Sequence, residues 1–343
     1  MKYFATSAIG AVLSVSFVSE ALATEWNVSV WGQRRAFTEH IHYLADAVSE
    51  ATNGAFTMNI SYGGLSNNRE NLDGISIGAF EMAQFCAGYH PDKNRAITVL
   101  ELPFMDVRNL DEEVAVSHAV YDHPAVAEEM AQWNARMLMT SPMPQYNLVG
   151  TGEPRDEVAE MDGMRVRATG GLGELFSSVG GVPTSVTSSE AYNAMESGVV
   201  DTVAFAQHAH LSFRTIDIAD WWTENLNPGT VNCPVVVNID AYEALTDEER
   251  AVLDAAVDDA IDYYLENYGE LLARWDEVRG RARGRARHDR RGAAGAARRG
   301  RGPDPRRLDR GNERRRPARA GALRSCGRHP AGGAFGQLSP GAS

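Results

Sequence analysis

The 343-residue sequence has little cysteine and no apolar run long enough to cross a membrane. There are three cysteines, and after the first residues no apolar stretch reaches the roughly 18 residues that a transmembrane helix needs. Hydrolase, zinc-protease and nucleotide-binding signatures such as G-x-S-x-G, H-E-x-x-H and G-x-x-x-x-G-K-[ST] are also missing. These absences argue against an integral membrane protein and against the common classes of motif-bearing enzyme.

The N-terminus has the pattern of a secretory signal peptide, residues 1–23. Lys2 gives the positive start, Ala8–Val18 the apolar stretch, and Ala21-Leu22-Ala23 an A-x-A cleavage site. We therefore expect an exported mature protein beginning at Thr24, periplasmic in a bacterium. In that oxidising compartment Cys86 and Cys233 either form a disulfide or remain two free, buried cysteines; the sequence leaves both open.

The net charge of −13 hides two unlike segments. Residues 279–343 contain 19 arginines, no lysine and 4 acidic residues, whereas residues 1–278 contain 14 basic and 42 acidic residues. The acidic body does not suit nucleic acid or an anionic membrane as a partner. The Arg/Gly/Ala-rich tail is typical of GC-rich DNA read out of frame; a disordered basic tail is the alternative.

Between these ends, strands alternate with helices. Alternating residues predict strands at 25–31, 56–62, 81–85, 136–140, 145–149, 164–168, 199–205 and 233–239. Helical spacing or capping signals predict helices at 41–48, 70–77, 111–120, 125–133, 175–179 and 188–195, and a long one over about 246–277 opened by a Thr246–Glu249 capping box. This order predicts an α/β fold with mostly parallel sheets. The length suggests two domains, 24–144 plus about 231–258 and 145–230.

Few side chains stand out as functional candidates. Arg167 ends a short strand and is followed by Gly170 and Gly171, and a guanidinium at such a strand end can bind a carboxylate through two parallel hydrogen bonds. Trp31, Phe85 and Phe205 also end predicted strands, where a ligand crevice forms. The ordinary alternatives are a salt-bridged arginine and core aromatics. The pairs His40/His42 and His208/His210 are expected to be ordinary histidines, not metal ligands.

Several segments together resemble the periplasmic solute-binding proteins of tripartite ATP-independent periplasmic (TRAP) transporters. The segments are GISIGAFEMAQF (74–85), LELPF (100–104), MDGMRVRATGG (161–171), EAYNAMESGVVD (190–201) and VVVNIDAYEALTDEERAVL (235–253). The resemblance implies two hinged domains that close over a ligand, a long helix bracing both, and no enzymatic activity, cofactor or metal. It also implies a carboxylate ligand, membrane permease subunits as partners and a monomer.

The resemblance also singles out Arg167 as the carboxylate-binding residue and makes Arg165 its strand neighbour, deeper from the cleft. Sialic-acid-binding members have a second arginine where this chain has Asn147, an asparagine at Phe205 and a glutamate near Cys86. These differences favour a monocarboxylate, or a zwitterion whose cationic end rests on Trp31, Phe85 or Phe205. Gln84, Asn147 and Asn227 are expected to add hydrogen bonds. A secreted hydrolase or lyase and a periplasmic ligand sensor remain alternatives.

Overall fold

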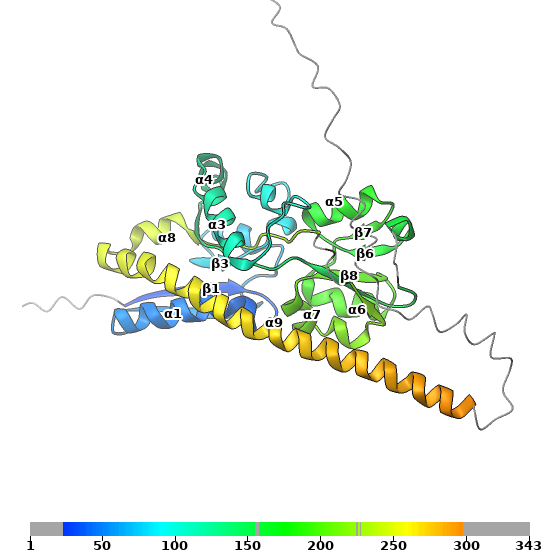
Figure 1. The fold of residues 1–343 in the computed structure, drawn as a ribbon. Coiled ribbons are helices and arrows are strands. Elements are labelled where there is room, and N and C mark those ends of the chain that lie inside the picture. The colour runs from blue at the N-terminus through cyan, green and yellow to red at the C-terminus, as the bar shows by residue number, and fades with distance from the viewer. Residues whose placement is uncertain (1–22, 155–157, 224–225, 227, 298–343) are drawn as a thin grey trace, which may run out of the picture.

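The structure is a computed structural model that describes residues 23–154, 158–223, 226 and 228–297. Two β-sheets lie side by side, each with its own helices, and form two domains (Figure 1). The first sheet has the order β2-β1-β3-β10-β4 and the second β7-β6-β8-β5-β9. The predicted α/β class with two domains is thereby confirmed.

The first domain is built on a β-sheet whose two faces are both covered by helices. Its strands are β1 (Thr24–Val30), β2 (Phe56–Tyr62), β3 (Met82–Gln84), β4 (Ala135–Met139) and β10 (Val235–Asn238). Its helices are α1 (Glu39–Ala51), α2 (Asn71–Ser76), α3 (Leu110–Tyr121), α4 (Pro124–Ala131) and α8 (Ile239–Ala244). In β10, Val235 and Val237 pack in the core beside α1, whereas Val236 packs in the core beside α2 and α4, as the two-residue period of a strand requires.

The second domain contains the remaining strands and shorter helices. Its strands are β5 (Asn147–Gly150), β6 (Arg165–Arg167), β7 (Val182–Thr184), β8 (Thr202–Phe205) and β9 (Trp221–Trp222). Its helices are α5 (Gly170–Ser178), α6 (Ala191–Glu196) and α7 (Gln207–Ser212). Single 3₁₀ turns connect the elements of both domains: η1 (Ala36–Thr38), η2 (Ala87–Tyr89), η3 (Ile97–Glu101), η4 (Val158–Met161), η5 (Ser188–Glu190) and η6 (Thr215–Ile218).

Strand directions in both sheets are more mixed than the sequence suggested. In the first sheet β1 is parallel to β2 and β3, but β10 is antiparallel to β3 and β4. In the second, β6 is parallel to β7 and β8, but β5 is antiparallel to β8 and β9. The antiparallel strands β5 and β10 are those that follow directly after the chain crosses from one domain to the other.

Two crossings connect the domains. The chain passes from β4 to β5 through residues 140–146 and returns from β9 to β10 within 223–234. We propose that the domain boundaries lie within these crossings, near residues 144 and 231. Two adjacent connections of this kind form a hinge about which the domains can rotate.

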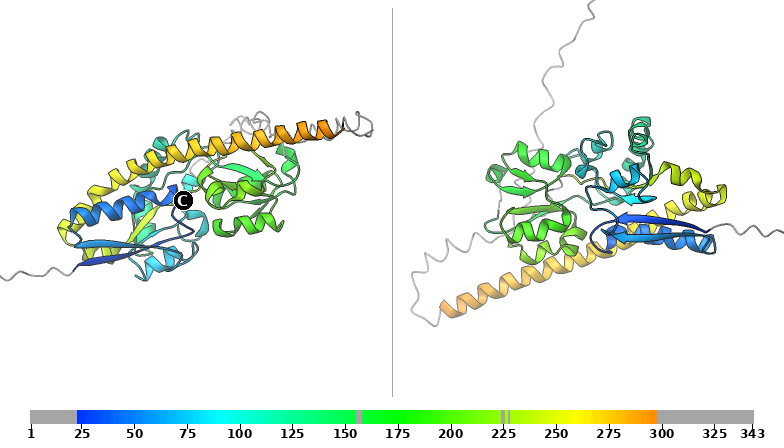
Figure 2. Two further views of the ribbon diagram at one scale, coloured as in Figure 1. Left: turned by 90° about the horizontal axis from the view of Figure 1, so that it is seen from below. Right: turned by 180° about the vertical axis from the view of Figure 1, so that it is seen from behind.

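The long helix α9 (Asp247–Ala297) packs against both domains (Figures 1 and 2). The capping box opens it, because the Glu249 backbone N–H donates to Thr246 Oγ1 and the Thr246 N–H donates back to Glu249 Oε2. Ile261 packs in the first domain's core, while Tyr264 and Tyr268 join the second domain's core. The helix extends beyond the expected end near Glu277 into the arginine-rich segment. Residues 298–343 and the signal peptide's residues 1–22 lie outside the described part.

Candidate functional site

A small cavity of about 30 Å³ lies between the two domains. The first domain contributes Trp31, Arg35 and Tyr89 to its walls, and the second contributes Arg167 and Phe205. The two crossings complete it. A volume of 10–15 Å³ on this measure is about one water, so the cavity holds roughly two waters in this closed arrangement. A larger ligand requires the domains to separate first.

Arg167 is almost fully buried, with 2% of its surface exposed, and it lines the cavity. Its Nε donates to the Val186 carbonyl (2.9 Å), Nη1 to the Ala204 carbonyl (3.3 Å) and Nη2 to the Tyr89 hydroxyl (2.7 Å). A guanidinium has five N–H donors, so two remain for a ligand. The Phe205 ring lies 4.4 Å from the guanidinium carbon and supports it from one face.

Arg165, two residues earlier on β6, is exposed to solvent. Its guanidinium pairs with Asp201 at 2.5 Å, and nearly half of its side chain is exposed. Arg165 therefore forms a surface salt bridge, and it does not line the cavity. Residues two apart in a strand share a face, so alternation does not separate the two arginines; Arg165 begins β6 and is exposed, whereas Arg167 ends it and lines the cavity.

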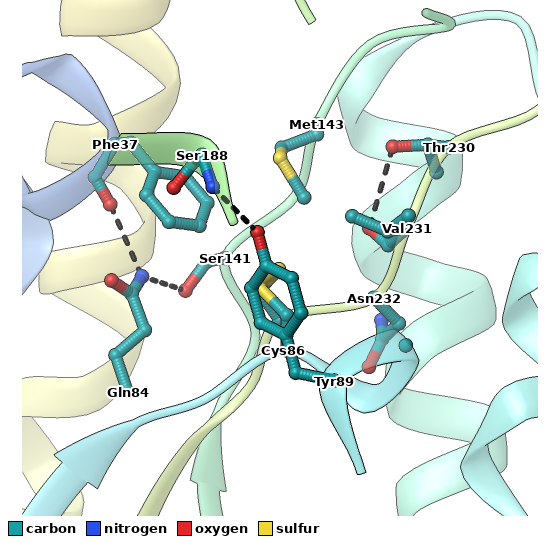
Figure 3. Close-up of a disulfide and its surroundings, with 12 residues drawn as sticks. Phe37, Gln84, Cys86, Tyr89, Ser141, Met143, Ser188, Thr230, Val231 and Asn232 are labelled. Carbon is teal, nitrogen blue, oxygen red and sulfur yellow. Dashed lines mark hydrogen bonds between the residues drawn. A yellow bond between two sulfur atoms is a disulfide. The ribbon is translucent and has the colours of Figure 1, made fainter. Parts of the chain in front are cut away.

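Hydrogen bonds from Tyr89 and Trp31 connect the two domains across the cavity. The Tyr89 hydroxyl accepts from Arg167 and from the Ser188 backbone N–H (3.0 Å), as Figure 3 shows for Ser188. The Trp31 indole N–H donates to Ser188 Oγ (3.2 Å). Tyr89 thus occupies one Arg167 donor in the closed protein without neutralising its charge.

Arg35 is a second guanidinium at the cavity that the sequence did not indicate. It follows β1 in the polar run Gly32-Gln33-Arg34-Arg35, which has no period that separates a buried from an exposed side chain. The structure buries Arg35 to 7% exposure, whereas its neighbour Arg34 is exposed and pairs with Glu39. Arg35 is distinguished by its ring contacts, a local one with Phe37 and a tertiary one with Phe213 of the second domain.

His208 lines the same cavity, His210 is buried two residues further on, and both are uncharged. Burial lowers the pKa of His208 well below its usual range and that of His210 to about 3. His208 stacks on Phe37 and shares a hydrogen bond with the Tyr268 hydroxyl (2.6 Å), while His210 bonds Thr215 Oγ1 (2.8 Å). The described residues contain no cluster of three or more His, Cys, Asp or Glu side chains that could hold a metal ion.

Of the predicted aromatic walls, Trp31 and Phe205 line the cavity, but Phe85 does not. Phe85 is fully buried in the first domain's core, edge-on to His90 at 5.6 Å. Its neighbour Cys86 has extended backbone and lines the cavity instead. Successive side chains alternate sides in extended chain, so the prediction for Phe85 was off by one residue.

Of the three predicted amides, Gln84 and Asn147 do not line the cavity either. Gln84 donates to the Phe37 carbonyl (3.2 Å) and Ser141 Oγ (2.9 Å), and so fixes the first crossing to β3 (Figure 3). Asn147 pairs with Phe205 across β5 and β8, and neither atom of its buried amide has a partner among the described residues. Asn227 lies outside the described residues.

Cys86 and Cys233 form a disulfide, which resolves the choice that the sequence left open. Their Cα atoms are 3.9 Å apart, although 147 residues separate them in the chain. The bond ties the end of β3 to the second crossing, and both residues line the cavity (Figure 3). One wall of the site is therefore covalently fixed.

The glycine pair after Arg167 accommodates a carboxylate of the protein itself. A Cβ on Gly170, which has φ +56°, would lie 1.8 Å from Glu101 Oε2, and one on Gly171 would lie 2.1 Å from the Glu101 carbonyl oxygen. Glu101 Oε1 accepts from the backbone N–H groups of Gly88 (3.2 Å) and Asn232 (3.0 Å). Burial raises the pKa of Glu101 to about 7.

The fold has counterparts among solved protein structures. A TRAP periplasmic solute-binding protein from Sulfitobacter sp. NAS-14.1 with bound β-D-galacturonate is 17% identical, has a TM-score of 0.67, and matches 76% of this chain and 87% of its own. DctP6, a Bordetella pertussis extracytoplasmic solute receptor binding pyroglutamic acid, is 16% identical, with a TM-score of 0.69 over 76% of this chain and 85% of its own.

Sequence comparison gives the same result. A solute-binding protein of Chromohalobacter salexigens is 21% identical over 277 residues, which are 80% of each chain. Residues 28–277 match the family model for the bacterial extracellular solute-binding protein, family 7. The described part contains no helix that is long and apolar enough to cross a membrane. The chain belongs to family 7 of the bacterial extracellular solute-binding proteins.

Proposed function

We propose that this protein captures a small organic acid in the periplasm and delivers it to the membrane subunits of a TRAP transporter. The observation that carries the proposal is Arg167, a buried guanidinium with two uncommitted donors in a cavity between hinged domains. Galacturonate and pyroglutamic acid, bound by the structural relatives, are both carboxylates.

Capture follows from the geometry of the closed cavity. The acid enters when the domains separate, and its carboxylate accepts two parallel hydrogen bonds from Arg167. Trp31 and Phe205 then exclude water from this ion pair, which strengthens it. Because Trp31, Tyr89 and Arg167 approach each other only in the closed form, ligand shifts the open–closed equilibrium toward closure.

The setting of this function is also part of the proposal. Export by the signal peptide, with cleavage after Ala23, places the mature monomer in the periplasm, where the Cys86–Cys233 disulfide can form. A permease would receive the acid from the closed form. Genes for a small and a large membrane subunit beside this one would support transport over a sensing role.

The test is to identify what the protein binds. Protein purified without denaturation is unfolded, and the released small molecules are identified by mass spectrometry. The proposal predicts one organic acid in about equal molar amount, recovered unchanged and able to rebind. Conversion of the acid by the folded protein would favour the hydrolase or lyase alternative, and a bound molecule without a carboxylate would refute the Arg167 assignment.

A further inference from the structure

The cavity contains an uncompensated positive charge that Arg167 does not explain. Arg35 lines the same cavity and has no carboxylate partner among the described residues. Burial lowers the pKa of Arg35 to about 10, so it remains cationic at neutral pH. A buried, unpaired cation is costly to the folded protein, and an anion that enters the cavity offsets that cost.

Arg35 is held in place by the backbone and retains donors for a ligand. Its Nη1 donates to the carbonyls of Trp31 and Gln33, both at 2.8 Å. These bonds engage one corner of the guanidinium and orient it rigidly. Its Nε is buried and has no hydrogen-bond partner in the described part of the chain. An N–H group in that state normally finds an acceptor.

The two guanidiniums lie on neighbouring rings of one aromatic wall. Arg167 lies 4.4 Å from the Phe205 ring centre, Arg35 lies 5.4 Å from that of Phe213, and these ring centres are 6.0 Å apart. Both arginines also line the same small cavity, so a single compact ligand bound there can contact both.

No negative side chain in the described part of the protein lines the cavity and offsets this charge. The described residues that line the cavity include two arginines, the neutral His208 and no aspartate or glutamate. An ammonium group would meet like charge there, which disfavours a zwitterion. The expectation of a single carboxylate depended on Asn147 in place of a second arginine, but Arg35 supplies a second cation from the other domain.

We propose that Arg35 is a specificity-determining residue that binds a second anionic group of the ligand, so that the preferred ligand is a compact acid with an anion at each end. This rests on the proposed function, in which Arg167 binds the first carboxylate. The second group is a carboxylate, sulfonate or phosphonate, since all three present oxygen acceptors to a guanidinium.

Calorimetry on ligand-free protein tests this assignment. Succinate, glutarate, sulfoacetate and phosphonoacetate are compared with acetate, butanoate and pentanoate, and the strongest two-ended acid identifies the second group. We expect it to bind the wild type about 100-fold more tightly than the one-ended acids, as for a buried charge pair. Arg35→Gln should remove this preference and leave the affinity for one-ended acids within a few-fold of wild type.

Arg34→Gln is the matched control, because Arg34 is the adjacent arginine but is exposed and paired with Glu39. It should retain the wild-type preference. An Arg35→Gln protein that still prefers two-ended acids would overturn the inference, as would a wild type that prefers one-ended ones. If no acid binds at all, the proposed function fails as well.

A second variant, Arg35→Lys, keeps the test valid if the Arg35→Gln protein does not fold. Arg35→Lys keeps the charge but loses the planar fork, and should show a preference between those of wild type and Arg35→Gln. Independently, the acid released from denatured wild-type protein must carry two anionic groups. A released acid with one anionic group would refute the role of Arg35 and leave that of Arg167 intact.

Discussion

At the scale of single residues, burial separates the arginines that line the cavity from those at the surface. Arg34 and Arg35 are adjacent, and Arg165 and Arg167 are two apart, yet in each pair one arginine is a surface salt bridge and the other lines the cavity. The family resemblance singled out Arg167 through the MDGMRVRATGG motif, and the structure places this residue at the cavity. Arg35 could not be found that way, since its burial depends on Phe37 and on Phe213 from the other domain.

Tyr89→Phe tests the contact across the closed cavity. Removing the hydroxyl leaves the Ser188 N–H and one Arg167 donor unpaired, so we expect the ligand-free protein to lose about 1–2 kcal/mol of unfolding free energy. Urea unfolding followed by circular dichroism measures the loss. Tyr192→Phe is the control, because its hydroxyl bonds only Glu196 at 3.4 Å near the surface. Equal stabilities of the two variants would contradict the contact.

At the scale of elements, the contact between η3 and the start of α5 explains the glycines after Arg167. The sequence placed these glycines beside a candidate carboxylate-binding arginine, and the structure packs them against Glu101. This could not be predicted, because Glu101 lies in another domain. Similarly, residue alternation gave the strands, but it could not show that β5 and β10 run antiparallel to their neighbours.

Gly170→Ala tests this packing. A Cβ would collide with Glu101 Oε2, so we expect a loss of more than about 2 kcal/mol. Gly163→Ala is the matched control: Gly163 also has positive φ, at +69°, but nothing lies within 4 Å of its added Cβ, and it should cost only about 1 kcal/mol. Unfolding in urea compares them. Equal losses would show that backbone conformation alone requires Gly170.

Glu101 also makes the stability of the fold depend on pH. Its pKa rises from 4.5 to about 7 on folding, so the folded protein holds a proton that the unfolded chain releases. Stability should therefore fall as pH rises from about 4.5 to 7, by up to about 3 kcal/mol from this group. Buried Glu113, also raised to about 7, adds a fall of the same sign.

Glu101→Gln should reduce the fall in unfolding free energy between pH 5 and pH 7 by about half, because Glu113 still titrates. Urea unfolding at the two pH values gives the difference. Glu174→Gln, an exposed glutamate on α5, is the control and should keep the full fall. A variant Glu101→Gln with the wild-type pH dependence would show that Glu101 is ionised throughout.

At the scale of the whole molecule, the disulfide and α9 connect parts that are distant in sequence. The long helix was predictable from its capping box and apolar stripe, while the disulfide required the fold, because Cys86 and Cys233 meet only when β3 and β10 are paired. Cys86→Ser/Cys233→Ser should cost about 2–5 kcal/mol of stability. Thermal unfolding with and without reductant measures this loss of stability. A wild-type protein whose melting temperature stays the same after full reduction of the disulfide would contradict the prediction.

The central claim is that Arg167 holds the carboxylate of the ligand, and calorimetric titration tests it most directly. The acid released from the wild-type protein is titrated into ligand-free wild type, Arg167→Gln and Arg165→Gln, each shown to be folded by circular dichroism. We predict at least about 100-fold weaker binding for Arg167→Gln and unchanged binding for Arg165→Gln. Wild-type affinity in folded Arg167→Gln would contradict the account.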